Sequence, residues 1–411
     1  MSIESRIVII GAGHAGGALA AQLREYGHRG PLCVIGDEAH LPYQRPPLSK
    51  AVLKGAATID SLSLKNAGYY QEHDIEVRTG QTVAAIDRDT RHVTLAGGEA
   101  LPYDYLVLAT GARPRQLAVP GAGLDNILAL RGIEDAQRLK EALQPGRRLA
   151  IVGGGYIGLE VAASARALGL EVTVIEREAR LLARVASAPL AEFFERLHQQ
   201  QGVQIIRNAC LSHFEGDTCV TAVHLEDGQR IDCDVALVGV GALPRDELAR
   251  AAGLHCENGV VVDGDARTSD PAIFAIGDMS WRPLPVYGER MFRLESVPNA
   301  TEQARQVACA IVGKPRPAAE VPWFWSDQYE VKLQIAGIPF DADRQVVRGD
   351  PAQGKFAVYH LRGERVVAVE AASSPLDFIA GKQFILSQAA VSLEKLADMS
   401  IKAKEAALVV A

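Results

Sequence analysis

Two stretches of the chain share one pattern of apolar and polar positions. The first reads RIVIIGAGHAGGALAAQL followed by LCVIGDEA, and the second reads RLAIVGGGYIGLEVAASA followed by VTVIEREA. Each consists of an apolar run, a glycine-rich turn, a helical stretch, a second apolar run and an acidic residue. This is the pattern of a βαβ unit, and the chain contains it twice, about 140 residues apart.

The pattern sets approximate bounds for these elements. In the first copy it predicts strands over 6–10 and 32–35 and a helix over 15–26. In the second copy it predicts a strand over 149–152, a helix over 156–168 and a strand that ends at Glu176.

Each turn carries three glycines in the spacing G-x-G-x-x-G, which are Gly11, Gly13, Gly16 and Gly153, Gly155, Gly158. The first glycine permits the tight turn, the second lets a pyrophosphate approach the backbone, and the third lets helix and strand pack closely. The helix N-terminus then offers free N–H groups to the phosphates. Asp37 and Glu176 are placed to accept hydrogen bonds from an adenosine ribose. One such turn alone also occurs for packing, but two copies predict two dinucleotide sites.

Composition and charge exclude several classes of protein. The 411 residues suggest two or three domains, and about half of them are hydrophobic, as in an ordinary globular chain. A net charge of −7 argues against nucleic-acid binding, although it leaves room for a local basic patch. The N-terminus shows no signal peptide and no long uncharged apolar run occurs, so we expect a cytoplasmic protein without a membrane span.

The six cysteines do not form a redox or metal motif. None makes a C-x-x-C or C-x-x-x-x-C pair, and the C-x-x-H formed by Cys210 and His213 has no second half nearby. We therefore predict no metal site and reduced, unpaired thiols.

Further motifs indicate a family. These are LVLATGARP at 106–114, LVGVGAL at 237–243 and IFAIGD at 273–278. Together with the two glycine turns they resemble the two-dinucleotide-binding-domain flavoprotein reductases, in order and spacing, along almost the whole chain. The resemblance is strongest to the NADH-dependent ferredoxin reductases of oxygenase systems.

The resemblance implies a fold of class α/β, with two Rossmann-like dinucleotide-binding domains and a smaller C-terminal α/β domain. The FAD-binding domain would be discontinuous, comprising 1–115 and 245–318, with an NAD-binding domain over 116–244 inserted in it. The C-terminal domain would cover 319–411. Its start is consistent with the proline-rich segment GKPRPAAEVP at 313–322.

The same resemblance implies the cofactor contacts. For FAD they would be Gly11, Gly13, His14, Ala15, Gly16, Asp37, Lys50, Val83, Thr110, Gly111, Arg131, Asp278, Val297 and Trp325. By sequence alone, the two valines are also typical of core positions and Lys50 of a solvated surface. Trp323 alternates with Trp325 along an expected strand, so one of the two is equally well explained as a core residue.

For the nicotinamide dinucleotide the contacts would be Gly153, Gly155, Tyr156, Ile157, Gly158, Glu160, Glu176, Arg184 and Gly241. Glu176 favours NADH, because a carboxylate accepts from the ribose 2′-OH and repels a 2′-phosphate. Arg177 and Arg184 lie close enough in sequence to accommodate that phosphate instead.

The resemblance assigns the catalytic roles to Lys50 and Glu160. This pair would orient the nicotinamide and flavin rings and bias the flavin electronics, so we expect no conventional acid–base catalyst. A glutamate on a helix is otherwise more often a solvated charge.

The acceptor implied by the resemblance is a 2Fe-2S ferredoxin that supplies an oxygenase, either a dioxygenase or a cytochrome monooxygenase. Arg305 and Lys382 match basic docking positions, although either is also an ordinary surface charge. The stretch 41–50 has no cysteine, unlike disulfide reductases and the peroxidase and oxidase branch. The alternatives are an NADH oxidase or small-molecule reductase, and an NADH sensor similar to apoptosis-inducing factor. The protein would be a monomer or a homodimer.

Overall fold

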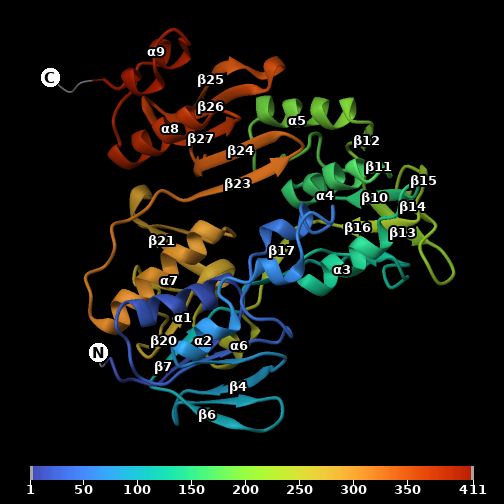
Figure 1. Cartoon of the computed structure of the whole chain (residues 1–411). Coiled ribbons are helices and arrows are strands. Elements are labelled where there is room, and N and C mark those ends of the chain that lie inside the picture. Colours follow the sequence, from blue (N-terminus) through green and yellow to red (C-terminus); the bar gives the residue numbers. More distant parts are fainter. Residues whose placement is uncertain (1–2, 409–411) are drawn as a thin grey trace. The chain divides into compact units, whose positions relative to one another are not determined.

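The computed structural model describes residues 3–408 (Figure 1). It divides them between two compact units, each built from three separate segments. Of the described residues, the first unit comprises 3–45, 60–113 and 243–322, and the second comprises 46–59, 114–242 and 323–408. Among the described residues, no helix is long and apolar enough to cross a bilayer.

The first unit centres on a five-stranded parallel sheet in the order β20-β7-β1-β2-β3. Its strands are β1 (Ile7–Ile10), β2 (Leu32–Ile35), β3 (Ile75–Arg78), β7 (Tyr105–Leu108) and β20 (Ile273–Ala275). β1 and β2 are buried along their whole length. That continuous burial is typical of a parallel sheet covered on both faces.

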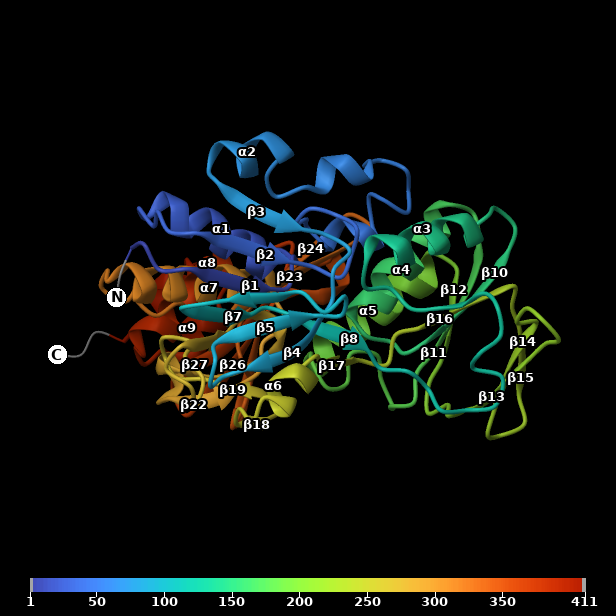
Figure 2. The same cartoon turned by 90° about the horizontal axis from the view of Figure 1, so that it is seen from below.

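Helices and small sheets cover this central sheet. α1 (His14–Glu25) and α7 (Val297–Val312) lie side by side over one face, and their apolar side chains share one core cluster with β1 and β2 (Figures 1 and 2). The other face packs against a second cluster that includes Val93, Val260 and Met279. The remaining elements are α2 (Ala67–Glu72), α6 (Glu247–Ala251), β4 (Val83–Asp87), β5 (His92–Leu95), β6 (Ala100–Pro102), β18 (Cys256–Glu257), β19 (Gly259–Val261), β21 (Ser280–Leu284) and β22 (Arg290–Phe292).

The second unit contains a second parallel sheet in the order β12-β11-β10-β16-β9. Its strands are β9 (Ile127–Leu128), β10 (Arg148–Val152), β11 (Glu171–Ile175), β12 (Val203–Ile206) and β16 (Val235–Val238). Its helices are α3 (Ile133–Ala142), α4 (Tyr156–Ala167) and α5 (Ala188–Gln200), beside a three-stranded sheet of β13 (Leu211–Glu215), β14 (Ala222–Leu225) and β15 (Arg230–Asp232). β8 (Ala112–Pro114) and β17 (Ala242–Pro244) form a two-stranded ribbon where the chain passes from one unit to the other.

The C-terminal part of the second unit is an antiparallel sheet in the order β23-β24-β27-β26-β25. Its elements are β23 (Trp323–Gln328), β24 (Val331–Gly337), β25 (Arg344–Asp350), β26 (Lys355–Arg362), β27 (Arg365–Ala372), α8 (Pro375–Ser387) and α9 (Leu393–Ala397). α8 packs on β27 and β24.

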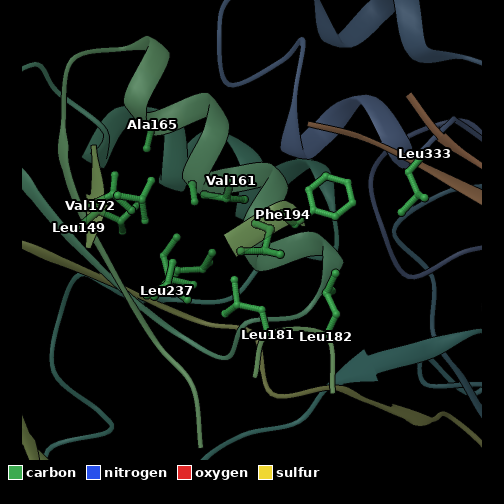
Figure 3. Packing of buried hydrophobic residues seen from close by; sticks show 14 of the residues in the cluster. Leu149, Val161, Ala165, Val172, Leu181, Leu182, Phe194, Leu237 and Leu333 are labelled. Atoms are coloured by element: carbon green, nitrogen blue, oxygen red, sulfur yellow. The ribbon is translucent and has the colours of Figure 1, made fainter. Parts of the chain in front are cut away.

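One apolar cluster joins the three segments of the second unit. It contains Leu53, Val161 of α4 and Phe194 of α5 together with Leu333 and Phe356 of the C-terminal sheet (Figure 3 labels all but Leu53 and Phe356). Phe193 packs edge-on against Phe356, with ring centroids 5.3 Å apart. This shared core explains why the C-terminal sheet and the second parallel sheet form one unit.

The predicted fold class is confirmed, and both βαβ units begin and end within a few residues of the predicted bounds. The structure groups two further segments with residues 114–242. Residues 46–59, which lie inside the expected FAD-binding part, pack with the second unit. Residues 323–408, which lie inside the C-terminal domain expected over 319–411, pack with the same unit.

Candidate functional site: two dinucleotide turns and a buried ion pair

Residues expected to contact cofactors cluster at one edge of each parallel sheet. In the first unit, the turn at Gly11 follows β1, Thr110 follows β7 and Asp278 follows β20. In the second unit, Gly153 follows β10, Glu176 follows β11 and Gly241 lies beyond the end of β16. Because all these strands are parallel, the carboxyl ends of each sheet meet at one edge, where open α/β sheets bind their ligands.

The two glycine turns have the same construction. Gly11 and Gly153 have φ values of +118° and +111°, which side chains rarely tolerate, and each donates its N–H to the last residue of the neighbouring strand. A Cβ on Gly16 would lie 2.0 Å from the carbonyl oxygen of Gly11, and one on Gly158 would lie 2.5 Å from that of Gly153. These contacts bring the first turn of each helix against the strand that precedes it.

The second glycine of each turn faces open space. Gly13 and Gly155 are the N-cap residues of α1 and α4, and neither has a side chain that could cap its helix. A Cβ on Gly155 would meet no heavy atom within 4 Å, and one on Gly13 would meet only Arg45, at 3.9 Å. An uncapped helix N-terminus with free space in front of it fits the pyrophosphate of a dinucleotide.

The first unit has one more feature that fits a bound ligand. His14 is the first residue of α1, and its Nδ1 is buried with no hydrogen-bond partner within residues 3–408. Burial lowers the pKa of His14, while the negative charge of Asp278 acts in the opposite direction. Ala15 follows as a buried residue of the same helix.

Asp37 and Glu176, the acidic residues of the two copies, do not lie at equivalent positions. Ile10 pairs with Ile35 and Val152 pairs with Ile175, so the residue equivalent to Glu176 is Gly36. A Cβ on Gly36 would lie 2.5 Å from the Cβ of Ala12, which excludes a side chain there. Asp37 lies one position later and forms a 2.8 Å ion pair with Arg245.

The Glu176 side chain accepts hydrogen bonds from two backbone N–H groups, one of them in the glycine turn at 153–158. Its Oε2 accepts the Gly154 N–H at 2.7 Å, and its Oε1 accepts the Glu178 N–H at 2.8 Å. A carboxylate has about four lone-pair positions, so both oxygens can still accept from a hydroxyl. Arg177 pairs with Glu178 at 2.9 Å on the surface, and Arg184 is exposed.

The other residues expected to bind FAD fall in both units. Thr110 donates to the carbonyl oxygen of Arg245 at 2.7 Å, and Gly111 follows it with a φ of +70°. Val83 opens β4 and packs against the Val93 cluster, and Val297 is the first residue of α7. Lys50, Arg131 and Trp325 belong to the second unit.

The predicted catalytic pair is formed within the second unit. Lys50 Nζ lies 2.5 Å from Glu160 Oε2, and the side chains are 17% and 7% exposed. Lys50 also donates to the carbonyl oxygen of Pro46 at 3.0 Å, which fixes the ammonium against the preceding turn. The solvated-surface interpretation of Lys50 and Glu160 is wrong, because both charges lie in a mostly buried pair.

Sequence reasoning missed three hydroxyl groups around this pair. Ser49 Oγ donates to Glu160 Oε2 at 2.5 Å, and Ser326 Oγ donates to Glu160 Oε1 at 2.7 Å. Ser164 Oγ donates a hydrogen bond to the carbonyl oxygen of Ser49 at 2.8 Å. The signal for Ser326 was the alternation along β23, which places it on the face opposite Trp323 and Trp325.

The aromatic side chains near the second turn are partly buried. Tyr156 packs edge-on against Phe324, with centroids 5.1 Å apart, and donates its hydroxyl to the carbonyl oxygen of Val185 at 3.2 Å. Burial raises the pKa of Tyr156 well above its usual value. Ile157, at the start of α4, is 51% exposed. The ring centroids of Trp323 and Trp325 lie 5.6 Å apart.

The state of the cysteines bears on redox chemistry. All six are free, and burial raises the pKa of Cys33 and of Cys233 to about 12. A thiol that holds its proton is a poor nucleophile and a poor redox centre. Within the described residues, no group of His, Cys, Asp and Glu side chains could hold a metal ion.

Comparisons with known proteins identify the family. The family model for pyridine nucleotide-disulphide oxidoreductases matches residues 5–304, and a reductase C-terminal model matches residues 323–407. The probable ferredoxin reductase CtmF of Castellaniella defragrans is 51% identical, over 98% of each chain. Putidaredoxin reductase CamA of Pseudomonas putida is 43% identical, over 98% of this chain and 97% of its own.

A solved structure is similar over the same length. The covalent putidaredoxin reductase–putidaredoxin complex matches with a TM-score of 0.95 at 43% identity, covering 98% of this chain and 97% of that one. The ferredoxin–NAD(+) reductase subunit of the benzene 1,2-dioxygenase system of Pseudomonas putida is 40% identical, over 97% of this chain and 96% of its own. The resemblance to ferredoxin reductases of oxygenase systems, which the motifs indicated, is thereby confirmed. The chain belongs to the pyridine nucleotide-disulphide oxidoreductase family.

Proposed function

We propose that the protein is an FAD-dependent NADH–ferredoxin reductase, which passes electrons from NADH to a 2Fe-2S ferredoxin serving an oxygenase. The observation that carries the proposal is the pair of glycine turns, each with an uncapped helix N-terminus and an open second glycine. Two such turns would hold two dinucleotides, and the relatives include a probable ferredoxin reductase and a putidaredoxin reductase. We also propose a cytoplasmic location.

The residues have separate tasks in this reaction. FAD, when bound, supplies the chemistry of accepting a hydride and of releasing electrons singly. The turn at Gly11, Gly13 and Gly16 would hold the pyrophosphate of FAD, and the turn at 153–158 would hold that of NADH. Lys50 and Glu160 would fix the orientation of the rings as an ion pair, with no proton transferred by either.

The proposed boundaries follow the same assignment. The FAD-binding part is 1–115 with 245–318, the NAD-binding part is 116–244, and the C-terminal part is 319–411. The structural grouping of 46–59 with the second unit supports a role for Lys50 beside the NADH turn.

Stopped-flow reduction tests the function. The FAD-loaded protein is mixed with NADH, and the reduced protein is then mixed with a 2Fe-2S ferredoxin or with oxygen. We expect fast reduction, rapid electron delivery to the ferredoxin and a slow reaction with oxygen. Fast oxidation by oxygen without ferredoxin reduction would identify an oxidase instead, and slow reduction into a long-lived complex would identify a sensor.

Glu176 is expected to set the preference for NADH. Glu176→Gln keeps one oxygen for the Gly154 N–H but removes the charge that repels a 2′-phosphate. The ratio of kcat/KM for NADH to that for NADPH should fall ~10-fold, about 1.4 kcal/mol. Glu171→Gln, at the exposed start of β11, the strand that Glu176 follows, is the matched control. An unchanged ratio in the Glu176 variant would show that this residue does not contact the ribose of the nicotinamide dinucleotide.

We propose Lys382 of the second unit and Arg305 of the first unit as separate candidates for residues that bind the ferredoxin. Lys382 Nζ lies 5.5 Å from the Trp323 ring centre, on a helix with three exposed apolar side chains, Leu376, Ile379 and Leu386. Exposed apolar side chains beside a cation are typical of a protein-binding surface. Arg305 forms an ion pair with Glu320, which neutralises part of its charge.

Replacing Lys382 by glutamine is therefore expected to slow association more than replacing Arg305 by glutamine. At low ionic strength, Lys382→Gln should lower the association rate with an acidic ferredoxin ~3–10-fold, with the difference shrinking as salt rises. Lys355→Gln, at the exposed start of β26, serves as the control. If all three variants associate with the ferredoxin at the same rate, neither Lys382 nor Arg305 contributes to ferredoxin binding.

A further inference from the structure

A line of hydrogen bonds runs from Glu160 into the interior of the second unit. Ser326 Oγ lies 2.7 Å from Glu160 Oε1, and Gln328 Nε2 lies 3.2 Å from Ser326 Oγ. His198 Nε2 lies 2.8 Å from Gln328 Oε1, and the Tyr329 hydroxyl lies 3.2 Å from His198 Nδ1. The line therefore joins α4, the strand β23, the helix α5 and the turn after β23.

Chemistry allows only one direction for these bonds. Glu160 pairs with the Lys50 ammonium as a carboxylate, and a carboxylate only accepts. Ser326 must therefore donate its single hydroxyl proton to Glu160, and it can then only accept from Gln328. The amide nitrogen of Gln328 faces Ser326, so its oxygen faces His198 and needs a donor there.

This direction fixes the tautomer of His198. Its Nε2 must carry the proton that Gln328 Oε1 accepts, and its Nδ1 accepts from the Tyr329 hydroxyl. Burial lowers the pKa of His198 to about 4, so the imidazole is neutral at physiological pH. Burial also raises the pKa of Tyr329 to about 12, so its hydroxyl keeps the proton to donate. Every donor in the line consequently points toward Glu160.

The line is shielded from water over most of its length. Ser326, Gln328 and His198 are fully buried, Glu160 is 6% exposed, and Tyr329 is half-buried at the outer end. Buried hydrogen bonds in a row polarise one another, and a broken link leaves its neighbours unsatisfied. The orientation of Glu160 is thus coupled to a histidine that does not touch it.

We propose that His198 is a positioning residue for hydride transfer, acting through Gln328 and Ser326 to hold the Glu160 carboxylate in its pairing with Lys50. The proposal rests on the function given above, and it requires no contact of His198 with NADH or FAD. Without the His198 N–H, the Gln328 amide is free to turn, Ser326 loses its donor, and Glu160 loses one of its fixed hydroxyl partners.

The test compares two substitutions of the same residue. In His198→Gln the new side chain presents an amide nitrogen near the place of the imidazole Nε2, whereas His198→Leu removes the donor. We expect His198→Leu to lower the limiting rate of flavin reduction ~3–10-fold, the size expected for one lost hydrogen bond, with little change in the Kd of NADH. His198→Gln should recover most of that rate.

Thermal unfolding and a control variant separate positioning from stability. His28→Leu removes a comparably buried histidine from the first unit and should leave the limiting rate unchanged. If His198→Leu reduces at the wild-type rate, the proposal is overturned. It is equally overturned if His198→Gln and His198→Leu are slowed alike, in proportion to their loss of melting temperature.

A spectroscopic measurement tests the line without turnover. In the FAD-loaded protein labelled with ¹⁵N-histidine, the His198 signals, assigned by their loss in His198→Gln, should show a neutral ring protonated at Nε2. Protonation at Nδ1 would contradict the direction of the line. If wild-type protein is not reduced by NADH, the proposed function fails, while this measurement still decides the arrangement of His198.

Discussion

Replacing Gly155 by valine is expected to raise the Kd of NADH ~100-fold, equivalent to about 2.8 kcal/mol, while FAD remains bound. A Cβ at this position meets no protein atom within 4 Å, and the backbone is extended, with φ −84° and ψ 175°. The fold therefore tolerates the side chain, and we expect a cost in stability of only about 1 kcal/mol from the weaker helix cap. The valine would instead occupy the space through which a pyrophosphate reaches the backbone N–H groups.

The measurement is a titration of the FAD-loaded variant with NADH under anaerobic conditions, together with the flavin content after purification. Gly123→Val is the matched control, because Gly123 also lies in open space in the second unit but far along the chain from the turn. Wild-type affinity in Gly155→Val would show that this turn does not hold the NADH pyrophosphate. Loss of FAD with unchanged NADH affinity would reverse the assignment of the two turns.

Replacing Glu160 by glutamine is expected to lower both stability and the rate of hydride transfer. The Lys50 ammonium, 17% exposed, would lose its counter-charge, and breaking a buried pair in this way costs about 3 kcal/mol or more. Displacement of the pair should slow flavin reduction by NADH ~10–100-fold, because a shift of about 1 Å in a reacting geometry has effects of that size. Chemical unfolding and stopped-flow reduction measure the two effects.

A double variant separates these two losses. Lys50→Met combined with Glu160→Gln removes both charges, so most of the lost stability should return. The rate should stay low, because the pair that orients the rings is absent. Recovery of both stability and rate in the double variant would show that the pair is only structural.

Local features of this fold could be predicted from the sequence. The strand over 6–10 is found at Ile7–Ile10 and the helix over 156–168 at Tyr156–Ala167, because apolar runs and glycine turns act within a few residues. The Lys50–Glu160 pair was predicted from the resemblance alone. Nothing in a local pattern indicates that two charges 110 positions apart lie 2.5 Å from each other.

Other features depend on packing that the sequence does not display. The offset of Asp37 relative to Glu176 appears only when the strand registers are compared. The Ser326–Glu160 and His198–Gln328 bonds join residues 166 and 130 positions apart. The C-terminal domain over 319–411 was predicted from the resemblance, and the core that joins Phe194 to Leu333 is visible only in three dimensions.

The interleaving of the two units has a consequence for synthesis on the ribosome. The first unit needs β20 and α7, up to Val312, to complete its sheet and cover α1, and the second needs β24 to β27, beyond residue 330, to complete its core. Neither can finish folding while the earlier part of the chain alone has emerged. We therefore expect apolar strands such as β1 and β10 to stay incompletely covered, and prone to aggregation, until the later segments have been synthesised. We expect a greater need for chaperones than in a chain of consecutive domains.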